Sequence, residues 1–192
     1  MTAKILVIPG SIRKGSINDK LAEALVADLN NRDANAIKVS LKDYPFPIYN
    51  ADIKTPQEVI DLAKKFADVD GLVFVSPEYN ASISPLLKNA IDWVSTSGIG
   101  DGQGYGPFTD KVCMIGSASP GDGAGRRGLY HLRAVLMNVG AEIITPQISV
   151  GLAGTAFDDD GALINETARK FADKAVSDLL LSIKRVKAVA RS

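Results

Sequence analysis

The chain has 192 residues, of which 46% are hydrophobic and 23% are charged, and its 22 basic and 22 acidic side chains give a formal net charge of zero. This length predicts one domain, residues 1–192, with a core large enough to need no second unit. Because a nucleic-acid partner requires a basic excess or a basic face, the neutral balance argues against one.

The single cysteine and the single histidine are both interpreted as structural. Cys113 lies in an apolar run typical of a buried strand, and His131 lies in a segment of helical periodicity. One cysteine allows no intrachain disulfide, and we expect no bound metal. The apolar run at residues 5–8 is too short for a signal peptide or a membrane span, so we expect a cytoplasmic protein without a membrane partner.

Apolar runs alternate with segments of helical periodicity about five times along the chain. The expected strands cover residues 3–8, 36–41, 71–75, 112–117 and 142–150, and the expected helices start near residues 19, 55, 84, 126 and 163. This alternation predicts an α/β fold, a parallel sheet with helices on both faces.

Two local patterns refine this expectation. In the second helix, Thr55 is expected to provide the capping hydroxyl and Pro56 to take the first helical position. The segment 97–106 carries a glycine at every second position from 98 onward, so we expect it to be mobile.

Three turns of unusual composition follow strands of this sheet, at residues 10–18, 76–80 and 117–125. Ligands of parallel α/β sheets bind beyond the carboxyl ends of the strands, where the strand order reverses. The three turns lie at that edge, so one ligand could contact all of them.

The first turn, Gly10-Ser11-Ile12-Arg13-Lys14-Gly15-Ser16-Ile17-Asn18, offers hydroxyls, an amide, a guanidinium and the free N–H groups of a helix start. These groups bind anions. It is neither a P-loop nor a Gly-x-Gly-x-x-Gly turn, and its hydroxyls and arginine suit a terminal phosphate. A mononucleotide follows, and FMN is the one that sheets of this kind hold. Alternatively, Ser16 is only an N-cap in a loose capping box with Asp19, and Ser11 and Arg13 are ordinary turn residues.

Three blocks, in this order, resemble the NADPH-dependent FMN reductase family of flavodoxin-like proteins. They are Gly10-Ser11-x-Arg13-x-x-Ser16-x-Asn18, Pro77-Glu78-Tyr79-Asn80 and Leu87-Lys88-Asn89-Ala90-Ile91-Asp92-Trp93. The resemblance covers about residues 1–180 and is strongest to the quinone, chromate and ferric-chelate reductases. It implies a flavodoxin-like three-layer sandwich with a five-stranded parallel sheet of order 2-1-3-4-5.

The resemblance also implies cofactor-binding residues in each turn. The FMN phosphate would be bound by Ser11, Arg13, Ser16, Ile17 and Asn18. The ribityl chain and one edge of the isoalloxazine ring would be bound, mainly through backbone groups, by Pro77, Glu78, Tyr79 and Asn80. The other side of the ring would be lined by Ser117, Ala118 and Ser119. Ala124 stands where the family usually has glycine, and the family's arginine corresponds to either Arg126 or Arg127.

The implied activity is that of an NAD(P)H:acceptor oxidoreductase. Hydride would pass from NADH or NADPH to FMN and then, in a ping-pong cycle, to quinones, flavins, chromate or ferric complexes. Because the flavin carries the chemistry, no catalytic side chain is predicted. Backbone N–H groups of residues 78–80 and 118–121 are expected to stabilise negative charge on the reduced ring. The physiological acceptor and the choice between NADH and NADPH stay open.

The resemblance further implies a homodimer or homotetramer, in which the second subunit closes over the flavin. The candidate contacts are residues 98–106 and the helix that contains Trp93. The alternative function is a flavodoxin-like electron carrier, an FMN-binding module without nicotinamide activity of its own. Against it, such carriers tend to be markedly acidic, and this chain is neutral.

Overall fold

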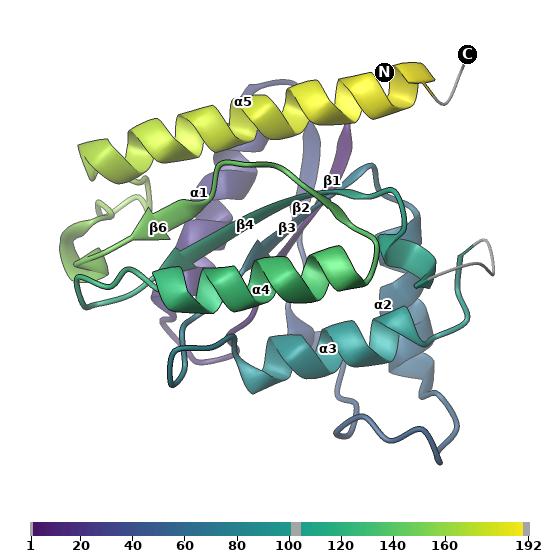
Figure 1. Ribbon diagram of the computed structural model, residues 1–192. Coiled ribbons are helices and arrows are strands. Elements are labelled where there is room, and N and C mark those ends of the chain that lie inside the picture. The colour runs from purple at the N-terminus through teal and green to yellow at the C-terminus, as the bar shows by residue number, and fades with distance from the viewer. Residues whose placement is uncertain (1, 101–104, 190–192) are drawn as a thin grey trace.

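The computed structural model describes residues 2–100 and 105–189. Its strands form one parallel sheet of order β2-β1-β3-β4-β5, and β6 also pairs with β4 (Figure 1). The strands are β1 (Lys4–Pro9), β2 (Asn35–Lys38), β3 (Gly71–Val75), β4 (Val112–Ala118), β5 (Glu142–Ile143) and β6 (Ile148–Val150). The strand order and the parallel pairing confirm the predicted flavodoxin-like sheet.

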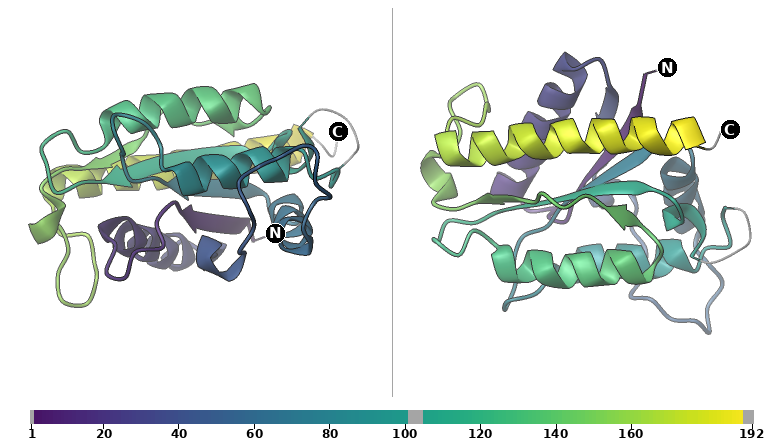
Figure 2. Two further views of the ribbon diagram at one scale, coloured as in Figure 1. Left: turned by 90° about the horizontal axis from the view of Figure 1, so that it is seen from below. Right: turned by 45° about the horizontal axis from the view of Figure 1, so that its top comes forward.

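Helices cover both faces of the sheet. They are α1 (Ile17–Asn31), α2 (Gln57–Ala67), α3 (Pro85–Ser95), α4 (Arg126–Asn138) and α5 (Glu166–Val189), with 3₁₀ turns at Leu41–Asp43, Gly106–Phe108 and Ala153–Thr155. Helices α1 and α5 pack on one face, and α2, α3 and α4 pack on the other (Figures 1 and 2).

Alternate residues of the central strands enter opposite layers of the core. In β1, Ile5 and Val7 pack beneath α1 and α5, whereas Leu6 and Ile8 pack beneath the other three helices. Because both faces are covered, the whole strand is apolar rather than alternating between apolar and polar residues. This two-sided burial is the physical reason for the continuous apolar runs in the sequence.

The predicted strand at 142–150 is interrupted. Cys113 pairs with Ile143 and Gly116 pairs with Ile148, so three steps along β4 correspond to five steps along the neighbouring chain. Pro146 lies in the interruption, where it cannot donate a ladder hydrogen bond. The Arg133 guanidinium of α4 donates to the carbonyl oxygens of residues 144 and 145 at 3.1 and 3.2 Å, and so satisfies them in place of a strand.

Two helix starts differ from the sequence-based expectation. The second helix begins at Gln57, with Pro56 in the N-cap position, and no side chain caps it, so the prediction of a Thr55 cap was wrong. The last helix begins at Glu166 rather than near Leu163, because the Asn165 side chain accepts a hydrogen bond from the N–H of Ala168 at 2.9 Å and marks its start. The expected mobility of 97–106 falls partly on residues 101–104, which lie outside the described residues.

Candidate functional site

Loops from the carboxyl ends of four strands meet at one edge of the sheet, and they cover residues 10–16, 76–84, 119–125 and 151–156. Main-chain hydrogen bonds join neighbouring loops. Gly10 N–H donates to the carbonyl of Val75 at 2.8 Å, and Ala153 N–H donates to the carbonyl of Ser119 at 3.1 Å. The three predicted turns are therefore brought together. The fourth loop was missed, although the glycine at 151 after an apolar run would have indicated it.

The first loop ends in an open helix N-terminus. Ser16 is the N-cap of α1, and its hydroxyl accepts from the N–H of Asp19 at 3.4 Å, as the alternative interpretation expected. The N–H groups of Ile17 and Asn18 precede the first intrahelical bond, so no carbonyl of α1 can accept from them. Arg13 is exposed and Ser11 is half-buried. The residues that cap the helix thus lie beside N–H groups that have no acceptor within α1.

The Asn18 side chain has a different role from the predicted phosphate contact. It is 3% exposed, and its amide faces the end of β4. The Asn18 Nδ2 donates to the carbonyl oxygen of Ala118 at 2.8 Å, and the N–H of Ala118 donates to Asn18 Oδ1 at 2.9 Å. This pair of bonds ties the start of α1 to the third loop. Only the main-chain N–H of Asn18 is left for a ligand.

The second loop contains a tight turn whose two central residues have left-handed backbone conformations. The N–H of Tyr79 donates to the carbonyl of Ser82 at 2.9 Å, and the N–H of Ser82 donates back at 3.0 Å. Asn80 and Ala81 between them have φ angles of 50° and 64°, the signs of a type I′ turn. Pro77 is buried beneath the turn, and Tyr79 is 47% exposed at its tip.

Glu78 connects this turn to α4. Its carboxylate accepts from the N–H of Gly128 at 3.1 Å and pairs with the Arg127 guanidinium at 2.9 Å. Burial opposes ionisation of Glu78, but these two donors outweigh it and lower its pKa. Glu78 therefore acts as the cap that α4 lacks in its own sequence. Arg127 makes this contact, and which of Arg126 and Arg127 corresponds to the family's arginine stays a prediction.

The third loop presents less surface than predicted. Ser117 and Ala118 are 0% and 2% exposed at the end of β4, so of the three residues expected to line the ring only Ser119 reaches the surface. The Ser117 hydroxyl has no hydrogen-bond partner within the described part of the chain. It lies directly against the Cα of Gly125, where a Cβ would collide with it. Ala124 has a φ of 52°, so it keeps the left-handed conformation that a glycine would adopt there.

Several of the N–H groups expected to stabilise the reduced ring are already occupied. The N–H of Tyr79 is bonded to Ser82, that of Ala118 to Asn18, and that of Ser119 to the carbonyl at 150. Across residues 2–100 and 105–189, the main-chain N–H of Asn80 has no acceptor. The exposed second turn is therefore the better source of a free donor at this edge.

His131 and Trp93, two side chains considered in the sequence analysis, both make contacts within the fold. His131 Nδ1 lies 3.0 Å from the Ser82 hydroxyl, which joins α4 to the second loop. Trp93 is 2% exposed, and its indole N–H donates to the carbonyl of Pro47 at 2.7 Å. The Trp93 side chain is therefore part of the core, and a contact of its helix with a second subunit stays a prediction.

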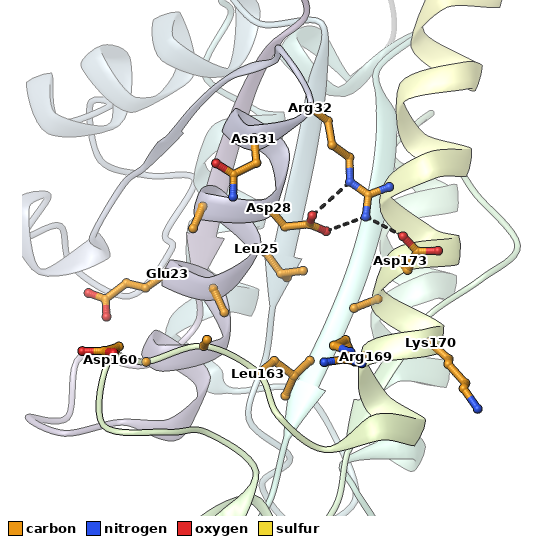
Figure 3. Close-up of a pocket in the computed structure, with 15 residues that line it drawn as sticks. Glu23, Leu25, Asp28, Asn31, Arg32, Asp160, Leu163, Arg169, Lys170 and Asp173 are labelled. Atoms are coloured by element: carbon orange, nitrogen blue, oxygen red, sulfur yellow. Dashed lines mark hydrogen bonds and ion pairs between the residues drawn. The ribbon is translucent and has the colours of Figure 1, made fainter.

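A pocket of about 590 Å³ lies elsewhere, between α1 and α5 (Figure 3). None of residues 11–18, 77–80 or 117–119 lines it. In the described ranges, no cluster of three or more metal-ligating side chains occurs, and no helix is long and apolar enough to cross a bilayer.

Comparison with known proteins decides the family. The model of the NADPH-dependent FMN reductase family matches residues 3–155. The chain belongs to this family. This family member is 31% identical over 189 residues to an NAD(P)H-dependent FMN reductase of Pseudomonas aeruginosa, with 96% of this chain and 97% of the relative covered. It is 36% identical over 147 residues to a quinone reductase of Escherichia coli K12, with 73% of each chain covered.

The fold of this FMN reductase family member agrees with a solved structure. The flavoenzyme FerB of Paracoccus denitrificans, an NAD(P)H:(acceptor) oxidoreductase, superposes with a TM-score of 0.82 at 27% identity, covering 96% of this chain and 98% of that one. The resemblance inferred from the three sequence blocks is therefore confirmed.

The Asn18 bridge predicts a large loss of stability when the amide is removed. Asn18→Leu leaves the N–H and carbonyl of Ala118 buried without partners, and we expect the free energy of unfolding to fall by about 2–4 kcal/mol. Asn18→Asp places a carboxylate oxygen against that carbonyl and should cost at least as much. Urea unfolding measures both, with Asn31→Leu on the exposed side of α1 as the control. An equal midpoint for Asn18→Leu and the control would contradict the role of the bridge.

The lowered pKa of Glu78 predicts a pH-dependent effect of Glu78→Gln. A carboxyl whose pKa is depressed by folding stabilises the protein above its unfolded pKa, near 4.5, and this contribution is lost as pH falls through the lowered value. The variant should therefore be less stable than the natural protein at pH 7, and the difference should shrink below pH 4.5. Arg127→Gln should have a smaller effect, because the Gly128 bond remains. A pH-independent difference in urea midpoints would argue against this assignment.

Proposed function

We propose that the protein is an FMN-dependent NAD(P)H:acceptor oxidoreductase whose cofactor binds at the carboxyl edge of β1, β3 and β4. The observation that carries this proposal is the open N-terminus of α1 beside Ser11, Arg13 and Ser16. It follows β1, which lies between β2 and β3, so the strand order reverses there. Nucleotides bind parallel sheets at such switch points. Membership of the FMN reductase family supports the same site.

The residues of the first loop fit a terminal phosphate. The 15-residue helix α1 directs its positive dipole end and the N–H groups of Ile17 and Asn18 toward the loop. The hydroxyls of Ser11 and Ser16 and the exposed guanidinium of Arg13 add further donors. Since the Asn18 amide is bonded to Ala118, we assign Asn18 a main-chain contact to the phosphate and the positioning of the third loop.

The second and third loops fit the rest of the cofactor. We assign the ribityl chain and ring edge to the main chain of the 77–80 segment, held in place by Glu78, and the opposite side to Ser119. Ser117 and Ala118 support this side from the sheet beneath. FMN, when bound, supplies the chemistry by which a hydride is taken from NAD(P)H and electrons are passed to an acceptor. The chain's residues orient the cofactor, and the exposed Tyr79 lies at the rim where a substrate enters.

The relatives support a small quinone as the acceptor, since the aligned protein of Escherichia coli is named a quinone reductase. Chromate, ferric complexes and free flavins remain predictions. We further infer a single domain, because every described strand joins one sheet, and a cytoplasmic location, where NAD(P)H is available. A homodimer or homotetramer is supported by two large side chains on one face of α4: Tyr130 is 64% exposed and Met137 is 61% exposed.

An anaerobic titration of the FMN-loaded protein tests the proposed function. We expect the oxidised flavin absorbance to bleach on addition of NADPH or NADH and to return when a quinone is added. A flavin band that stays oxidised with both nucleotides would favour the electron-carrier alternative. Failure to bind FMN at all would refute the assignment of the first loop.

Arg13→Ala tests the phosphate contact separately from electron transfer. Loss of one charge-assisted hydrogen bond, worth about 1.5–3 kcal/mol, should weaken FMN binding by about 10- to 100-fold. The matched control is Lys14→Ala, which removes an equal charge from the neighbouring exposed position. Fluorescence titration of FMN into the apoprotein measures both. Equal weakening by the two substitutions would show only a general electrostatic effect.

A further inference from the structure

The pocket between α1 and α5 is separate from the proposed cofactor site, although α1 borders both. The first turn of α1 carries the phosphate-binding groups, whereas the pocket begins at Glu23 and follows the second half of the helix. Its volume of about 590 Å³ lies within the range of small-molecule sites, about 300–1,000 Å³. Apolar side chains from both helices and from the preceding loop line it: Ala24, Leu25, Ala27, Leu163 and Ala172.

A network centred on Arg32 closes one end of the pocket. The guanidinium donates to Asp28 on its own helix at 3.0 Å and to Asp173 on α5 at 2.6 Å (Figure 3). A further bond reaches the Ser177 hydroxyl at 2.9 Å. These bonds join α1 to α5 at this end. They also occupy Arg32 and both carboxylates, so this end offers a ligand neither a free cation nor an unpaired anion.

Besides Arg32, the pocket is lined by two basic residues, Arg169 and Lys170. Figure 3 shows Arg169 beside Leu163 on the pocket side of α5, whereas the charged end of Lys170 points outward. Within the two described stretches of the chain, the Arg169 guanidinium has no ion pair or side-chain hydrogen bond. Across the pocket, Glu23 is paired with Lys38 at 2.7 Å, and Asp160 is the neighbouring carboxylate.

We propose that this pocket binds a small organic anion that has an apolar, ring-sized body and one carboxylate or sulfonate group. The apolar lining takes the body, and Arg169 pairs with the anionic group, because its planar guanidinium can donate two parallel hydrogen bonds to such a group. Asp160 on the opposite side repels a second negative charge and so orients the ligand. The inference does not depend on the proposed oxidoreductase function.

Calorimetric titration with 8-anilinonaphthalene-1-sulfonate, which has this chemistry, tests the proposal on the FMN-loaded protein. We expect one site, whose affinity falls by about tenfold or more in Arg169→Gln, since a charge-assisted hydrogen bond is worth about 1.5–3 kcal/mol. Arg169→Lys should retain part of the affinity. The matched control is Lys184→Gln, which removes the same charge from an exposed position of α5 outside the pocket lining and should leave the affinity unchanged.

Ala24→Trp tests the apolar lining independently of charge. The larger side chain fills the space between α1 and α5 and should abolish binding. If Ala24→Trp does not fold, the substitutions at the exposed Arg169 still test the proposal. Equal affinities of Arg169→Gln and the natural protein, or equal losses in Arg169→Gln and Lys184→Gln, would overturn the proposal. Binding that is lost when FMN is added to the apoprotein would place the probe in the cofactor site and would also overturn it. Absence of FMN binding, by contrast, would refute only the proposed function.

Discussion

Two hydrogen bonds between the Asn18 amide and the main chain of Ala118 hold the functional edge of this protein together. The ladder between β3 and β4 stops at Gly116, two residues before the end of β4, and the buried N–H and carbonyl of Ala118 need other partners. Asn18 supplies a donor and an acceptor at once, from the first turn of α1. The first loop, proposed to bind the phosphate, and the third loop are therefore held at one spacing, which a cofactor that spans them would require.

The second loop is held by charge rather than by a continued ladder. Glu78 caps α4 from outside that helix, because Gly125 at the N-cap position has no side chain with which to do so. The turn beyond it contains Asn80 and Ala81 in left-handed conformations, which for a residue with a Cβ cost about 1–2 kcal/mol. Such conformations persist where surrounding contacts enforce them, and here they fix the exposed rim of the site.

Helix α1 links the two sites of the molecule. Its N-terminus faces the proposed phosphate position, and its second half forms a wall of the pocket whose end is closed by Arg32. One helix therefore borders the proposed cofactor site at the sheet edge and a pocket on the helical layer. The two proposed sites differ in chemistry: the first offers N–H groups, hydroxyls and the Arg13 guanidinium, and the second offers an apolar lining beside Arg169, with Arg32 already paired to Asp28 and Asp173.

The sequence by itself determined the fold class and the three turns of the site. A strand buried on both faces must be apolar throughout, and a helix that covers it must have an apolar stripe, so the alternation is visible in local composition. The motifs around Ser16 and Pro77 likewise lie within short stretches, and the family match confirms the family that they indicated, whereas their part in binding FMN stays a prediction.

Only the tertiary structure decided what individual side chains do. Asn18 and Ala118 are 100 positions apart, and so no local pattern shows that the amide is occupied. The burial of Ser117, the pairing of Glu78 with Arg127 and the pocket beside Arg169 also arise between segments distant in the chain. Spacing in sequence reports which residues share a face of one element, whereas hydrogen bonds and cavities between elements depend on how those elements pack, and the packing exists only in the folded chain.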